Sequence, residues 1–196
     1  MESNRFAIIL SGLLLTPAMP AVWGGWAVVT VEELPDHVVG GHPIQLTFTV
    51  RQHGVSPMNG LKPTVELKFR GSETQVSATP AREPGQYSAT VTLPRAGHWN
   101  ITINSGFNQS RATLLPVTAS DSGTPAPVVS EADRGRQLFV AKGCVSCHLH
   151  SQFKNADVET AGPDLSNRRY PVEVLRQVMA PRGGASSTRK MPDLQL

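Results

Sequence analysis

The sequence predicts two structured regions, an all-β sandwich followed by an all-α region, and three observations support this division. Stretches of β-branched and alternating apolar residues fill the chain up to about residue 118. A polar segment rich in proline and serine occupies 119–130. Beyond it, apolar residues recur at helical rather than strand spacing. We therefore expect a leader at 1–21, a β-domain at 22–118, a linker at 119–130 and a helical domain at 131–196.

The composition is that of a globular protein with two small domains. The chain has 196 residues, of which 39% are hydrophobic and 17% charged. Its 17 glycines and 16 prolines favour short strands and turns. The net charge of +3 and the lack of basic runs with interleaved aromatic residues argue against nucleic acid as a partner.

The N-terminus has the pattern of an export signal. Arg5 precedes the apolar run 6–15, and small residues follow at Ala18 and Ala21. Two prolines interrupt the uncharged stretch, which favours a cleaved signal over a retained membrane anchor. We expect a periplasmic or other extracytoplasmic location, and the pattern leaves membrane association open.

Six segments of the N-terminal half have strand character, and turn signals rich in glycine separate them. Strands with one buried face at this frequency predict an antiparallel sandwich large enough for its own core. The expected strands are 26–31, 43–50, 64–69, 86–93, 98–103 and 112–117.

Two helices are expected after the linker. Ser130 and Asp133 have the spacing of a capping box, which predicts a helix from there to about Lys142. A second helix fits 171–179, because Pro171 suits a first turn and apolar residues share one face after it.

The only two cysteines stand in the string Cys144-Val145-Ser146-Cys147-His148. An isolated CxxC is compatible with a disulfide, a redox dithiol or a metal site. A redox dithiol would need a βαβ setting, and zinc would need a second ligand pair at a suitable spacing. Two thiols at this spacing can instead bond to the two vinyl groups of one porphyrin, and the adjacent histidine then reaches the iron. The string therefore predicts one covalently attached haem c.

Further strings in 131–196 accompany this motif. Gly135 and Phe139 lie on the first expected helix, Gly162-Pro163-Asp164-Leu165 follows the CxxCH, and Lys190-Met191-Pro192 comes near the end. Together they resemble the class I cytochromes c. The resemblance implies that the Pro163 carbonyl accepts a hydrogen bond from His148 and that Met191 is the second axial ligand. It also implies a final helix after Met191, for which the chain to Leu196 is too short, so we expect a fragment.

A His148/Met191 pair leaves no open coordination position, which favours outer-sphere electron transfer over enzymatic chemistry. Met179 and His150 are the rival distal ligands. We expect an exported carrier of single electrons between a respiratory donor and acceptor, and not an enzyme. A haem enzyme remains an alternative if Met191 is displaced. Basic residues suggest that the partner is a membrane respiratory complex with an acidic docking surface. They are Arg168, Arg169, Arg182, Arg189 and Lys190.

The β-half contains the strings 48–54, 85–94 and Gly97-His98-Trp99. They resemble the YtkA-like family of small exported domains, related in style to copper-handling CopC and FixH proteins. The resemblance implies an immunoglobulin-like sandwich that serves as a docking module. Copper held by His53 and Met58, which flank a loop, is the alternative. The protein would then be a copper-binding or terminal-oxidase assembly factor with a redox haem.

Overall fold

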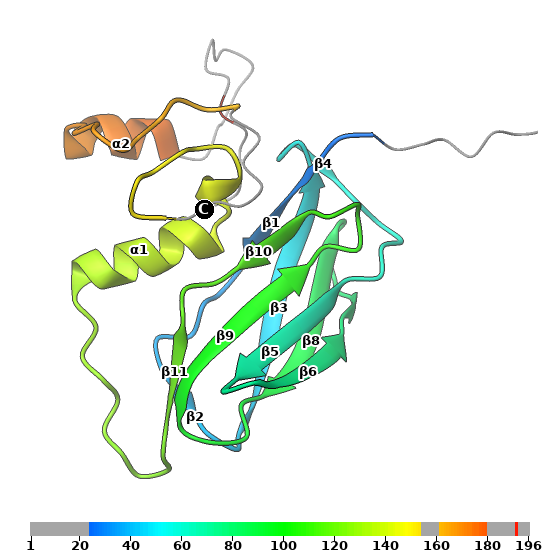
Figure 1. The fold of residues 1–196 in the computed structure, drawn as a ribbon. Helices are drawn as coiled ribbons and strands as arrows, with labels where there is room; N and C mark the ends of the chain where they lie inside the picture. The colour runs from blue at the N-terminus through cyan, green and yellow to red at the C-terminus, as the bar shows by residue number, and fades with distance from the viewer. Residues whose placement is uncertain (1–23, 154–160, 180–190, 192–196) are drawn as a thin grey trace, which may run out of the picture.

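The computed structural model describes residues 24–153, 161–179 and 191 (Figure 1). It contains an N-terminal β-sandwich of two sheets, followed by a short C-terminal region with two α-helices. The predicted leader at 1–21 and the residues on both sides of Met191 lie outside the described residues. No helix in the described part of the chain is long and apolar enough to cross a membrane.

The first sheet has the strand order β1-β3-β8-β7, and β4 pairs with the end of β3. Its strands are β1 (Ala27–Val31), β3 (Pro43–Gln52), β4 (Ser56–Pro57), β7 (Thr79–Pro80) and β8 (Gln86–Thr92). The second sheet has the order β2-β11-β9-β5-β6, and β10 also pairs with β9. Its strands are β2 (Val38–Val39), β5 (Thr64–Phe69), β6 (Ser72–Ser77), β9 (Gly97–Asn104), β10 (Arg111–Thr113) and β11 (Val117–Ser120).

The core lies between the two sheets, where alternate residues of each strand point inward. In β5, for example, Val65, Leu67 and Phe69 are buried while the residues between them are not. The buried hydroxyl of Tyr87 has hydrogen-bond partners. The Tyr87 hydroxyl donates to the Met58 carbonyl at 2.7 Å and accepts from the Leu61 N–H at 3.0 Å. This buried hydroxyl is therefore hydrogen-bonded within the sandwich.

The prediction of an entirely antiparallel sandwich is wrong at one pair. β2 runs parallel to β11, with Val38 opposite Ala119. The segment between β1 and β3 forms the end strand of the second sheet. Its two residues, β2, pair with β11, the last strand of the domain. β11 also continues to Ser120, two residues into the predicted linker.

The strand predicted at 112–117 is two strands, β10 and β11, that both pair with β9. Pro116 lies between them, and proline provides no N–H for a ladder. The edge strand β6 was not predicted, because most of its residues are polar and exposed.

Both predicted helices are present, as α1 (Glu131–Ala141) and α2 (Val172–Met179), with a 3₁₀ turn η1 (Cys144–Ser146) between them. The Ser130 hydroxyl caps α1 by accepting the Asp133 N–H at 3.1 Å. α1 lies beside β1 and β10 of the sandwich (Figure 1). α2 has no buried residue.

Candidate functional site

The end of α1 places the CxxCH string. The Lys142 N–H bonds to the Leu138 carbonyl, and Gly143 follows with a left-handed φ of 77°. This glycine conformation ends the helix and reverses the chain into η1. The His148 N–H then bonds back to the Cys144 carbonyl at 2.9 Å. The two cysteines and the histidine therefore lie on one tight turn.

A cavity of about 590 Å³ lies between α1, this turn and α2. Its walls are largely apolar, and Cys144, His148, Pro163 and Met191 all line it. Other lining residues are Phe139, His150, Phe153, Leu165, Arg168, Tyr170, Val174, Leu175, Val178 and Met179.

His148 is held from behind by the turn at 162–163. Its Nδ1 lies 2.9 Å from the Pro163 carbonyl oxygen. A carbonyl only accepts, so Nδ1 carries the proton and the neutral ring has its lone pair on Nε2. Gly162 packs against the same ring, since a Cβ there would lie 2.4 Å from His148 Cε1. The Gly162 N–H also bonds to the Cys147 carbonyl at 2.9 Å. These contacts fix both the orientation and the tautomer of a histidine suited to bind a metal.

Cys144 and Cys147 are free thiols, each half-buried. Burial raises the pKa of the Cys144 thiol to about 11 and also raises the pKa of the Cys147 thiol. Reactive dithiols of oxidoreductases have lowered thiol pKa values instead. The environment thus gives no support to the redox-dithiol alternative. Among the described residues, no group of three or more His, Cys, Asp or Glu side chains is arranged to hold a metal ion.

Aromatic rings form one wall of the cavity. The Phe139 and Phe153 rings stack with centroids 5.2 Å apart, and the His150 ring lies 5.9 Å from Phe139. Phe153 was not predicted as a site residue, because it has no motif or periodic partner and is recognisable only as an apolar residue soon after CxxCH.

The opposite wall is the apolar face of α2. Val174, Leu175 and Met179 line the cavity yet remain 39%, 38% and 47% exposed. A helix this apolar on one face normally buries that face. Within the described residues it faces only the cavity.

Met191 is half-buried and lines the same cavity as His148. The two residues predicted as axial ligands therefore share one cavity. The alternative copper ligands His53 and Met58 lie away from this cavity, and Met58 is 7% exposed within the sandwich core. His53 is exposed on a turn, with its ring 5.6 Å from that of Trp26. Copper binding by these two residues stays a prediction.

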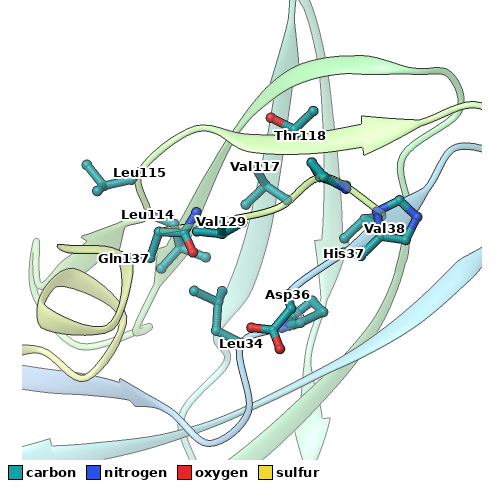
Figure 2. Close-up of a pocket in the computed structure, with 12 residues that line it drawn as sticks. Leu34, Asp36, His37, Val38, Leu114, Leu115, Val117, Thr118, Val129 and Gln137 are labelled. Atoms are coloured by element: carbon teal, nitrogen blue, oxygen red, sulfur yellow. The ribbon is translucent and has the colours of Figure 1, made fainter. Parts of the chain in front are cut away.

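A second, smaller cavity of about 110 Å³ lies where the sandwich, the linker and α1 meet (Figure 2). Asp36, His37, Thr118 and Gln137 have polar side chains among its lining residues. His37 Nδ1 is buried there with no hydrogen-bond partner among the described residues. The space suits a few water molecules rather than a cofactor.

No protein family model matches this chain, and no curated protein matches it. Among solved structures, it is similar to the solution structure of the PKD domain from human VPS10 domain-containing receptor SorCS2. That similarity has 12% identity and a TM-score of 0.29, and it covers 63% of this chain and 100% of that chain. A TM-score this low carries no argument, so the sandwich assignment rests on the strand pairings described above.

Proposed function

We propose that this protein is an exported c-type cytochrome that carries single electrons, with one haem attached through Cys144 and Cys147 and bound by His148. The observation that carries the proposal is the shared cavity of Cys144, His148 and Met191, in which the Pro163 carbonyl orients the imidazole. The CxxCH string and the 162–165 turn resemble class I cytochromes c, and this geometry is compatible with that resemblance.

The residues around the cavity fit a haem. A volume of about 590 Å³ lies within the roughly 300–1,000 Å³ typical of ligand and cofactor sites. The stacked rings of Phe139 and Phe153 provide an apolar wall for a flat ring system. A group in the cavity would also cover Val174 and Leu175, whose burial would stabilise α2.

The two thiols suit covalent attachment. Each S–H would add across one vinyl C=C, so that sulfur bonds to one carbon and the hydrogen ends on the other. The addition would consume no oxidant or reductant, but it would require both sulfurs as thiols. That Cys144 and Cys147 form no disulfide is compatible with this requirement.

The residues that would hold the iron determine the kind of chemistry. His148 and Met191 would both bind it, and the iron would supply a one-electron couple whose ferrous state a thioether ligand favours. With both residues bound, small molecules would have no access to the metal. We therefore propose electron transfer rather than enzymatic turnover.

The sandwich, which resembles YtkA-like domains, would dock the haem region on an extracytoplasmic redox partner. Arg168 and Arg169 are exposed near the cavity and suit an acidic partner surface, here a membrane respiratory complex.

The test is an optical spectrum of the full chain expressed with a c-type haem maturation system, together with a pyridine haemochrome assay. We expect one haem per chain and the weak ferric sulfur-to-iron band. Met191→Ala should keep the haem, lose that band and allow carbon monoxide to bind the reduced protein. The control is Met179→Ala, which also lines the cavity and should retain the band. A chain without covalent haem would contradict the proposal.

A further inference from the structure

The outer face of β1 is buried, although β1 is the end strand of its sheet. All five of its residues are buried. Val29 belongs to the core between the sheets, whereas Val28 points to the opposite face and is still 0% exposed. Exposed edge strands are normally protected from pairing with other chains. Here β10 and the C-terminal region both lie against β1.

The contact is made by the junction between α1 and the CxxCH turn. Ala141 is 0% exposed and is a member of the sandwich core cluster itself. A Cβ on Gly143 would lie 2.6 Å from Val28 Cγ1 and 2.8 Å from the Val29 carbonyl oxygen. The backbone that leads directly into Cys144 thus touches the edge of β1.

Two basic side chains, Lys142 and Arg134, bond to the segment that follows β1. Lys142 Nζ donates to the Glu32 carbonyl at 2.8 Å. Arg134 Nη2 donates to the Leu34 carbonyl at 2.7 Å and lies 2.8 Å from an Asp36 carboxylate oxygen. These bonds connect α1 to the segment that follows β1, so the helix is fixed at two points along its length.

We propose that the sandwich is a structural part of the cofactor site, in which the β1 edge holds the CxxCH turn in place. Lys142 and Gly143 are positioning residues that act through Cys144 and His148. This inference rests on the proposed function for the identity of the cofactor. On this proposal α1 and the CxxCH turn form one body with the sandwich, so the orientation of the bound cofactor would be fixed relative to the sandwich.

The first experiment tests the shared body without any cofactor. Residues 121–126 are exposed and can be replaced by a protease site, which leaves Pro127 and Val129 at the smaller cavity unchanged. After cleavage of the folded full chain, both pieces should elute together at the mass of the intact protein. Pieces that separate at micromolar concentration would overturn the proposal.

The second experiment tests positioning with the haem-loaded full chain. Gly143→Ala should lower the haem content per chain at least fivefold, because its Cβ collides with β1. Gly71→Ala is the matched control: Gly71 has a comparable φ of 87°, with open space around its Cβ. It should stay within twofold of the wild type. Equal haem content in all three proteins would overturn the role of Gly143.

Two substitutions of Lys142 distinguish a positioning role from a general effect on stability. Lys142→Met should alter the ferric spectrum of the attached haem, and Lys142→Arg should restore it by donating to the same carbonyl. Identical spectra for the Met variant and the wild type would overturn the role of Lys142. A wild type without haem would refute the proposed function, while the cleavage experiment would still decide whether the two regions share one body.

Discussion

The sandwich and the helical region bury their apolar residues in different ways. The sandwich fills its own interior, where side chains such as Phe48, Tyr87 and Val91 are at most 1% exposed. In α1 only Val140 and Ala141 are buried, and α2 has no buried residue. The helices instead surround a cavity. The difference indicates that the sandwich is stabilised mainly by its own core, whereas the buried residues of the two helices lie only at the end of α1, where it meets the sandwich.

The largest effect should come from removing the attachment site. In Cys144→Ala/Cys147→Ala we expect no covalent haem and rapid amide exchange throughout α2, since its apolar face loses its cover. Exchange in the sandwich strands should not change. Hydrogen exchange by mass spectrometry on the variant and the haem-loaded wild type measures both regions at once. Equal protection of α2 in the two proteins would contradict the comparison.

Phe48→Ala should destabilise the sandwich by about 3–5 kcal/mol, because it leaves a cavity in a closed core. Phe48 is 0% exposed, and its ring stacks on Tyr87 at 6.2 Å. Urea unfolding followed by tryptophan fluorescence gives the free energy. Val55→Ala is the control, since Val55 is 65% exposed and should change stability little.

Tyr87→Phe should cost about 1–3 kcal/mol, because the Met58 carbonyl and the Leu61 N–H both lose their partner. The same unfolding measurement applies. Tyr170→Phe removes a hydroxyl from a residue that is 40% exposed and should have no measurable effect. If both variants lost the same unfolding free energy, the loss in Tyr87→Phe would not come from its two buried hydrogen bonds.

Ser130→Ala should have the smallest effect, about 1 kcal/mol, confined to α1. Hydrogen bonding by Ser130, followed by that of Arg136, lowers the pKa of Asp133. The stabilising carboxylate is therefore fully present above the ordinary Asp pKa of about 3.9 and is lost as the pH falls through the lowered value. Circular dichroism between pH 6 and pH 2 should show this loss in the wild type and in Ser122→Ala, but less of it in Ser130→Ala.

Local patterns were sufficient to predict much of the fold. The alternation Val65, Leu67, Phe69 identified β5, and Ser130 located the start of α1. The parallel pairing of β2 could not be predicted, because two residues carry no periodicity and their partner lies some 80 residues later in the chain. The break at Pro116 was visible in the sequence, but the apolar residues around it suggested one continuous strand.

The candidate site also has a part that local sequence predicts and a part that depends on contacts between distant residues. The CxxCH spacing places Cys144 and His148 on one turn, because five consecutive residues determine that turn locally. The contact of Gly143 with Val28 joins positions more than 100 residues apart and leaves no local signal. Whether a haem occupies the cavity stays a prediction.

The position of β1 also affects the order of folding. All strand pairings of both sheets lie within Ala27–Ser120, and chains are synthesised from the N-terminus. The sandwich can therefore complete its sheets without the C-terminal region, and Val28 and Val29 are then in place as a template. In the proposed cytochrome the attachment turn would be shaped on that template, so the slow β-pairing steps would precede haem attachment rather than compete with it.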